Sequence, residues 1–273
     1  MYNQCLKVAN RNILRNGFVK LIDIMPKEIP IEARALGCDS AVVQAARVSY
    51  AQGLKDTKSD IKLINYLYKH KHTSPFEMVK FKFHVKAPIF VARQWFRHRM
   101  GNYNEISGRY TVLNEDIYVP IKIPSQNTKN KQLSNNDNLF NNNKKVNELQ
   151  TKYMNNCMEQ FNIYQQLMSL GVSREVARIG LPLNLFTEFY WSIDLHNLLN
   201  FIKLRNSDKA QFEIKEYARN IEEIVENYCP ITINAFRNNK QINLSIEQIN
   251  SLKINSLDNL SEREKIELES FFS

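Results

Sequence analysis

An alternating segment at residues 79–85, VKFKFHV, is the feature that most limits how this chain can fold. Its valines and phenylalanines lie on one face, and two lysines and a histidine lie on the other. A period of two residues is typical of a strand with one buried face. Residues 17–24 predict a second strand. The chain must therefore build a sheet whose two faces differ in polarity.

Helical spacing of apolar residues is more frequent than alternation. It predicts helices at 61–68, 89–98, 153–168, 188–205 and 210–227, and a short helix from Ser173 toward Pro182. Pro88 is placed to begin the helix at 89–98, and Gly101 can end it in the left-handed conformation. Because helices outnumber strands without alternating regularly with them, we assign the α+β class. We expect one domain with a mixed or antiparallel sheet flanked by long helices.

Net charge and the distribution of apolar residues limit which class of protein this chain can belong to. The 273 residues hold 37 Lys+Arg against 28 Asp+Glu, and 37 − 28 gives a net charge of +9. The sequence contains no apolar run near 18 residues and no signal-peptide core in its first twenty residues, so we expect a cytoplasmic protein without a membrane span. A basic surface attracts anions, which include nucleic acid, nucleotides and phosphorylated cofactors.

The cysteines predict neither a disulfide framework nor a metal site. Cys5, Cys38, Cys157 and Cys229 are too far apart for a CxxC pair, and no zinc-ligand spacing occurs. We therefore expect no metal.

The region at about 125–150 is rich in Asn and Lys and poor in apolar residues. Its composition buries too little apolar surface to offset the entropy of ordering, so we interpret it as an inserted loop. The domain is expected to span residues 1–240. A weak amphipathic pattern predicts a peripheral helical tail at 241–273.

Residue types that often serve in binding or catalysis are concentrated at residues 97–110, RHRMGNYNEISGRY. This segment holds three arginines, a histidine, a glutamate, a serine and two glycines. Arginine binds phosphate through two parallel hydrogen bonds, and glycine lets backbone N–H groups approach an anion. A solvated loop or an Arg–Glu interface is the alternative. The density of functional side chains favours an anion-binding site.

Neighbouring residues extend this site if the local structure is regular. Gln94, Arg97 and His98 share one face of a helix. In an extended segment, Glu105, Ser107 and Arg109 point to one side.

Three further groups are candidate functional residues, and two of them also have a structural explanation. Residues 72–77, HTSPFE, form a turn before the strand, and simple turn chemistry would explain them as well. His196, Asn200 and Leu204 form a stripe on an otherwise apolar helix. Arg174 and Arg178 are four residues apart, and both are also common as surface charges.

At these residues the chain resembles the flavin-dependent thymidylate synthases, over about residues 17–237. The family signature is Arg-His-Arg, seven residues and then Ser, which here is Arg97-His98-Arg99 through Ser107. Further matching motifs lie at residues 72–77, 86–96, 174–178, 181–184 and 200–205. Several motifs in the same order make a chance match improbable.

The resemblance implies reductive methylation of dUMP to dTMP. Methylenetetrahydrofolate supplies the carbon, FAD relays the hydride, and NADPH or a related donor reduces the flavin. The resemblance also implies a homotetramer with each flavin where subunits meet, and it implies neither a nucleic-acid nor a membrane partner.

The matched positions carry the family's site residues. The FAD-binding residues implied are His72, Ser74, Arg97, His98, Arg99, Glu105, Asp194, His196 and Asn200. The dUMP-binding residues implied are Gln94, Trp95, Phe96, Arg97, Glu105, Ile106, Ser107, Gly108, Arg109, Arg178 and Arg205.

Arg205 is the expected catalytic residue. A cation at the O2/N3 edge of uracil stabilises the negative charge that makes C5 nucleophilic. Ser107 lacks an obvious general base, with His98 only a remote candidate, so we interpret it as a hydrogen-bonding partner of the nucleotide.

Three alternatives remain open at this point. The +9 charge suggests a nucleic-acid-binding protein, although no RRM, zinc or helix-turn-helix signature is present. Cys229 before Pro230 suggests a cysteine-nucleophile thymidylate synthase, or only the end of a helix. The third alternative is a flavoprotein scaffold that has lost its activity.

Overall fold

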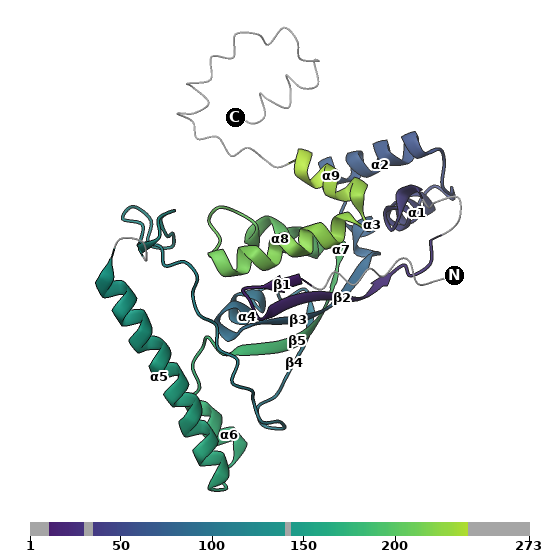
Figure 1. The fold of residues 1–273 in the computed structure, drawn as a ribbon. Coiled ribbons are helices and arrows are strands. Elements are labelled where there is room, and N and C mark those ends of the chain that lie inside the picture. Colours follow the sequence, from purple (N-terminus) through teal and green to yellow (C-terminus); the bar gives the residue numbers. More distant parts are fainter. Residues whose placement is uncertain (1–10, 30–34, 140–142, 240–273) are drawn as a thin grey trace. The chain divides into compact units, whose positions relative to one another are not determined.

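The structure is a computed structural model that describes residues 11–29, 35–139 and 143–239 (Figure 1). The chain divides into two compact units, Met1–Asn238 and Asn239–Ser273, and the fold described below is that of the first unit. The helical tail predicted for 241–273 lies outside the described residues.

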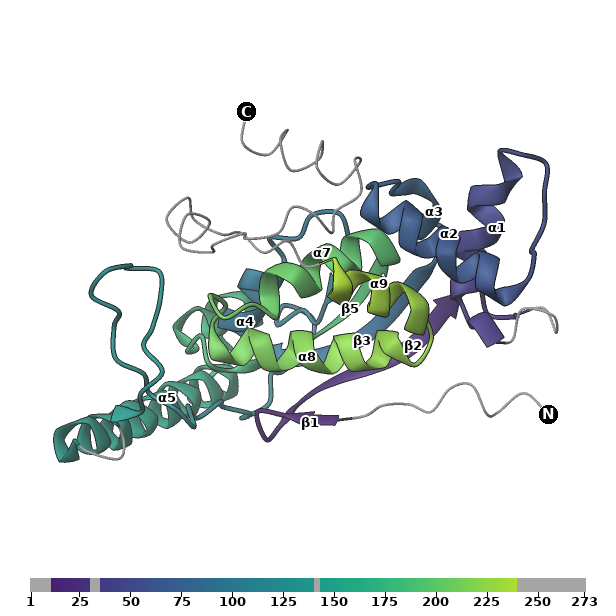
Figure 2. The same cartoon turned by 90° about the horizontal axis from the view of Figure 1, so that it is seen from above.

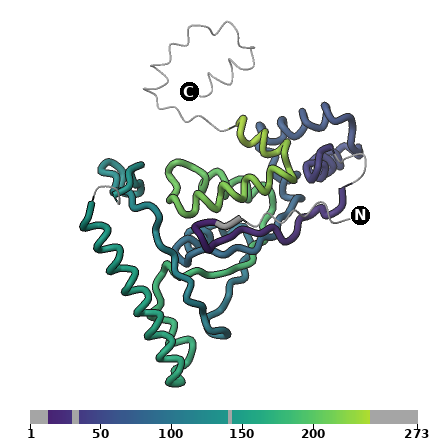
Figure 3. Tube along the Cα trace, in the orientation of Figure 1, coloured from purple at the N-terminus to yellow at the C-terminus, as the bar shows by residue number. Residues whose placement is uncertain are grey.

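In the described part of the chain, five strands form one sheet in the order β1-β2-β3-β5-β4. The strands are β1 Arg11–Ile13, β2 Gly17–Met25, β3 Lys80–Pro88, β4 Asn102–Glu105 and β5 Phe186–Asp194. Each pairing is antiparallel, with Phe83 of β3 opposite Leu21 on one side and Trp191 on the other. The tube in Figure 3 shows that the N-terminal strands and β5, far apart in the sequence, share this sheet. The α+β class is confirmed, and the sheet is antiparallel.

The helices of the described residues vary from one turn to seven. They are α1 Asp39–Val48, α2 Thr57–Lys69, α3 Ser74–Glu77, α4 Ile89–Trp95, α5 Lys144–Ser169, α6 Arg174–Ala177, the 3-10 helix η3 Arg178–Gly180, α7 Leu195–Arg205, α8 Phe212–Glu226 and α9 Pro230–Asn238. Seen from above, α7 and α8 lie over the sheet (Figure 2). Among the residues placed here, none of the helices is both long and apolar enough to cross a membrane.

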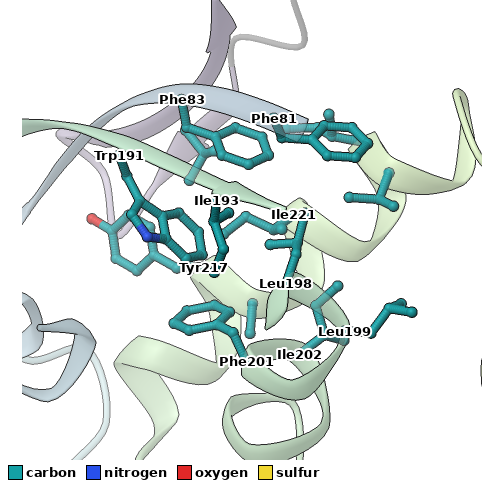
Figure 4. Packing of buried hydrophobic residues seen from close by; sticks show 14 of the residues in the cluster. Phe81, Phe83, Trp191, Ile193, Leu198, Leu199, Phe201, Ile202, Tyr217 and Ile221 are labelled. Atoms are coloured by element: carbon teal, nitrogen blue, oxygen red, sulfur yellow. The ribbon is translucent and has the colours of Figure 1, made fainter. Parts of the chain in front are cut away.

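The alternation at 79–85 predicted β3 correctly, and the strand continues to Pro88. Phe81, Phe83 and Val85 are at most 1% exposed, whereas Lys80 and Lys82 are exposed. Side chains of β3, β5, α7 and α8 meet in the core shown in Figure 4, where Trp191 and Phe201 pack with ring centroids 4.9 Å apart. This core fixes α7 against the sheet.

The single helix predicted at 188–205 is wrong in its first half, because β5 occupies Phe186–Asp194 and only α7 is helical. Phe189, Trp191 and Ile193 alternate with more polar residues and are buried beneath the helices. The Asp194 side chain then accepts a hydrogen bond from the Asn197 backbone N–H at 2.9 Å. This N-cap ends the strand and begins the helix.

The inserted loop predicted at 125–150 is shorter than expected. Residues 125–138 contain neither helix nor ladder strand, and asparagine side chains bind the backbone there, as when Asn127 Oδ1 accepts from Lys129 N at 3.0 Å. From Lys144 onward the chain is helical, because the Asn143 side chain caps α5 by accepting from Val146 N. The last seven residues of the predicted loop are therefore the first two turns of α5.

Candidate active site

The connection from α4 to β4 carries the arginine-rich segment. The helix ends at Trp95, not at His98 as predicted, with the Phe96 N–H still bonded to the Ala92 carbonyl. Gly101 is not in the left-handed conformation, which corrects its predicted role. A Cβ there would lie 2.3 Å from Nε1 of Trp191. Gly101 is therefore required because the turn passes directly against that indole.

Arg205, the last residue of α7, meets this connection. Its Nε donates to Nε2 of His98 at 2.9 Å, and its Nη2 donates to the Gln94 carbonyl at 3.1 Å. The His98 ring also lies edge-on to Phe201, with centroids 4.8 Å apart. The residues predicted to share a helix face, Gln94 and His98, thus both contact the expected catalytic arginine.

His98 is neutral at physiological pH. Burial is the main cause that lowers the pKa of its imidazole to about 4, and the positive charge of Arg205 lowers it further. A guanidinium only donates hydrogen bonds, so Nε2 must carry a lone pair and the ring proton lies on Nδ1. His98 is therefore an acceptor for Arg205, not a second cation.

This pKa predicts how stability depends on pH. In the unfolded chain His98 takes up a proton near pH 6.5, but in the folded chain it does so only near pH 4. The unfolded state binds more protons in this window, so we expect the free energy of unfolding to fall as pH drops from about 6.5 to 4. Urea unfolding at several pH values measures this pH dependence of the free energy of unfolding. His98→Gln, which does not titrate, should reduce this slope, and an unchanged slope would contradict the assignment.

A second group forms where the turn after β4 meets α6. Nη1 of Arg174 donates to the Tyr110 carbonyl at 2.8 Å, and Arg109 pairs with Glu175 at 3.1 Å. A Cβ on Gly108 would lie 3.0 Å from Cδ of Arg178, so that side chain crosses directly over the glycine. The structure therefore brings Gly108, Arg109 and Arg178 together.

The predicted extended run from Glu105 to Arg109 ends early. β4 stops at Glu105, and the Ser107 carbonyl accepts from both Tyr110 N at 3.0 Å and Thr111 N at 3.1 Å. Ser107 Oγ accepts from Arg109 N at 3.3 Å. A turn, not a strand, therefore gathers Ser107, Gly108 and Arg109.

Glu105 is held by a residue that the sequence analysis missed. Thr187 of β5 is buried, and its Oγ1 donates to Oε1 of Glu105 at 2.6 Å. The alternation of Phe189, Trp191 and Ile193 would have placed Thr187 on a strand, but the segment was interpreted as a helix. Thr187 fixes the carboxylate at the sheet edge.

Several arginines of the site have no counter-charge. Among the described residues, the guanidinium groups of Arg97, Arg99 and Arg178 make no ion pair or hydrogen bond, and Arg97 and Arg99 are exposed. Unpaired cations beside a glycine turn suit the phosphates of a nucleotide and of a dinucleotide such as FAD. The side chains present therefore fit a phosphorylated substrate and a phosphorylated cofactor.

Comparison with known proteins decides the family. Residues 33–231 match the thymidylate synthase complementing protein family. The chain belongs to this family. A flavin-dependent thymidylate synthase of Thermus thermophilus is 51% identical over 224 residues, covering 82% of this chain and 77% of that protein. One from Treponema denticola is 42% identical over 245 residues, covering 88% and 87%.

A solved structure supports the same assignment for the fold of this family member. A UMP/dUMP methylase from Streptomyces cacaoi bound with 5-Br dUMP superposes with a TM-score of 0.69 at 28% identity. The match covers 81% of this chain and 95% of that chain. The resemblance identified from the Arg-His-Arg motif is confirmed.

Two aromatic residues just before the Arg-His-Arg motif pack against the core. Trp95 is 0% exposed, and its ring packs against Trp191, Phe201 and Tyr217. Phe96 is half-buried, with its ring edge-on to neighbouring aromatic residues. The Trp95 side chain is closed off from solvent, so the dUMP contact implied by the resemblance stays a prediction that concerns its backbone. Its side chain anchors the end of α4 in the core.

The cofactor residues expected on α7 differ in their surroundings. His196 is half-buried and Asn200 is exposed, so both remain accessible. The Asp194 carboxylate is already engaged, because Oδ1 and Oδ2 accept from the backbone and the side chain of Asn197. Asp194 thus acts first as the helix cap.

His72 and Ser74 lie at a separate part of the fold, around α3. Ser74 is exposed at the first position of α3. The exposed His72 ring stacks on Tyr66 of α2 with centroids 5.9 Å apart. Tyr66 also lines an open groove of about 440 Å³ between α1 and α2. His72 is therefore open to solvent and contacts the groove only through Tyr66.

Cys229 is not placed as a nucleophile. It is 0% exposed, and burial raises the pKa of its thiol well above 9.0. Pro230 behind it begins α9, so the pair joins two helices. Among residues 11–29, 35–139 and 143–239, no three His, Cys, Asp or Glu side chains gather where they could hold a metal.

Cys229→Ser is expected to leave kcat unchanged, because a buried neutral thiol cannot attack a substrate. Steady-state turnover, measured well below the Tm of the variant, checks this. Cys229→Ala is the matched control, since it removes the sulfur without burying a hydroxyl. Loss of turnover in both variants, with folding and flavin binding intact, would restore the cysteine-nucleophile alternative.

Proposed function

We propose that this chain methylates dUMP to dTMP, with FAD as cofactor, 5,10-methylenetetrahydrofolate as carbon donor and NADPH as reductant. The observation that carries the proposal is the meeting of Arg205 with Gln94 and His98 beside arginines that lack a counter-charge. The names of the curated relatives and the nucleotide-bound methylase support it.

The proposed binding roles draw on the two groups of the site, on α7 and on the residues around α3. We assign dUMP to Gln94, the backbone of Trp95, Phe96, Arg97, Glu105, Ile106, Ser107, Gly108, Arg109, Arg178 and Arg205. We assign FAD to His72, Ser74, Arg97, His98, Arg99, Glu105, Asp194, His196 and Asn200, and Asp194 also caps the start of α7. The arginines bind phosphate oxygens, and the turn at Ser107 presents backbone N–H groups and a hydroxyl to the nucleotide.

In this assignment the chain itself activates the pyrimidine. Arg205 places its guanidinium at the O2/N3 edge of uracil, where it stabilises the negative charge that makes C5 a nucleophile. Ser107 donates a hydrogen bond to the nucleotide and orients it. When bound, FAD supplies the hydride chemistry, and the protein supplies position and polarity.

We further propose a homotetramer in which flavin sites lie where subunits meet, with residues 1–240 as the synthase domain. Exposed apolar side chains on α5 support an assembly, since a helix in water normally turns such residues inward. They are Leu149, Tyr153, Met158 and Ile163.

Anaerobic flavin absorbance tests the function. The purified protein is titrated with NADPH, with and without dUMP, while its visible flavin absorbance is followed. Bleaching by NADPH that responds to dUMP is expected, because flavin, reductant and nucleotide then share one site. A colourless protein that takes up no added FAD would overturn the proposal. Strongly salt-dependent binding of random oligonucleotides would then favour the nucleic-acid alternative.

A further inference from the structure

Within the part of the chain that the structure describes, the guanidinium of Arg205 is bound along one of its edges. Of its five N–H donors, one on Nε bonds to His98 and one on Nη2 bonds to the Gln94 carbonyl. Both bonds lie on the side of the group that faces α4 and the segment after it. Three N–H donors remain, including both on Nη1, so the far end can still make a bidentate contact.

The two acceptors are not equivalent. The Gln94 carbonyl belongs to the backbone of α4, so it survives any side-chain substitution. His98 accepts through its side chain, and the acceptor exists only while the ring is neutral. The low pKa of His98 keeps the ring in this form. Among described residues, His98 is thus the side chain on which the orientation of Nε depends.

The position of His98 is itself determined by the fold. Its ring lies against Phe201, which is 0% exposed in the core of α7. Its backbone carbonyl accepts from the Tyr103 hydroxyl at 2.8 Å, and Tyr103 pairs with Trp191 across β4 and β5. The acceptor is therefore supported by α7 on one side and by the sheet on the other.

We propose that His98 is a positioning residue for pyrimidine activation: its Nε2 accepts from Nε of Arg205 and aims the free end of the guanidinium at the O2/N3 edge of uracil. This inference rests on the proposed function, because it assumes that Arg205 acts on the nucleotide. It gives the central histidine of the Arg-His-Arg motif a role separate from cofactor contact. The role is orientation of a neighbouring cation.

Two substitutions at His98 separate the effect of losing the hydrogen-bond acceptor from the effect of losing the packing contact. His98→Leu fills the space against Phe201 but cannot accept a hydrogen bond. His98→Gln offers Oε1 near the position of Nε2. We expect His98→Leu to lower kcat about 10–100-fold, since a small misplacement of a reacting group has an effect of this size. His98→Gln should restore kcat to within about threefold of the parent.

The readouts distinguish orientation from cofactor loss and from misfolding. Flavin content, the rate of flavin reduction by NADPH and the Tm are measured for both variants, and kcat and KM for dUMP are determined separately. A loss confined to kcat in His98→Leu, with rescue in His98→Gln, supports the proposal. Equal kcat in the leucine variant and the parent overturns it. So does equal loss in both variants.

A double-substitution cycle decides whether His98 acts through Arg205. In an Arg205→Ala background, His98→Leu should change kcat by less than about twofold, because no guanidinium remains to be oriented. A full additional loss in that background would overturn the inference and leave the proposed function intact. If Arg205→Ala itself keeps full turnover, the proposed role of Arg205 fails first.

Discussion

Arg205→Ala is expected to lower kcat about 10²–10³-fold, the effect of removing one preorganised group that stabilises developing charge. The residue is half-buried, and its bonds to His98 and Gln94 hold it in place before any substrate arrives. Arg205 is not part of the hydrophobic core, so the fold should survive the change. Steady-state kinetics with saturating dUMP, folate and NADPH measure the effect.

Arg205→Lys is the matched variant for this prediction. Lysine keeps the positive charge but loses the planar fork, so it cannot bond to His98 and to uracil in the same geometry. We expect a kcat between those of the parent and the alanine variant. The flavin absorbance of both variants should equal that of the parent. An Arg205→Ala enzyme with a kcat within about threefold of the parent would contradict the mechanism.

Arg47→Ala is expected to destabilise the fold by about 3–5 kcal/mol, because it leaves a buried carboxylate without its partner. Arg47 of α1 pairs with Asp60 of α2, and the two residues are 6% and 0% exposed. Arg47 also donates to the Gly53 carbonyl at 3.0 Å. Among the described residues, the second carboxylate oxygen of Asp60 has no hydrogen-bond partner, so the whole charge depends on Arg47.

The measurement is urea unfolding, compared through the midpoint and the m-value. The control is the double variant Arg47→Met with Asp60→Leu, which replaces both charges by apolar side chains. It should recover most of the loss, because the penalty comes from the unpaired charge and not from the missing contact. A single variant within about 1 kcal/mol of the parent would show that the pair contributes little.

Local patterns predicted the parts of this protein whose structure depends on near neighbours. The alternation at 79–85 located β3, and apolar spacing located α2, α5 and α8. The dense group of arginines and glycines at 97–110 marked the site and the family. These features are visible in the sequence because strand and helix periods repeat within a few residues.

The boundary between β5 and α7 was missed because two signals overlap. Apolar residues are frequent on both sides of Asp194, and short stretches of this kind fit a buried strand as well as a helix. Pairing of β5 with both β3 and β4 settled the choice, and the Asp194 cap ended the strand.

The contacts that make the site work depend on tertiary structure. Arg205 lies 107 residues from His98 in the sequence, and Thr187 lies 82 residues from Glu105. No local pattern records which acceptor a distant guanidinium will find, or that Trp95 will be enclosed. The sequence by itself determined which chemical groups the site contains and to which family the chain belongs. Only the tertiary structure, through packing of α7 on the sheet and pairing of β4 with β5, decided which groups meet, because those distances depend on the whole core.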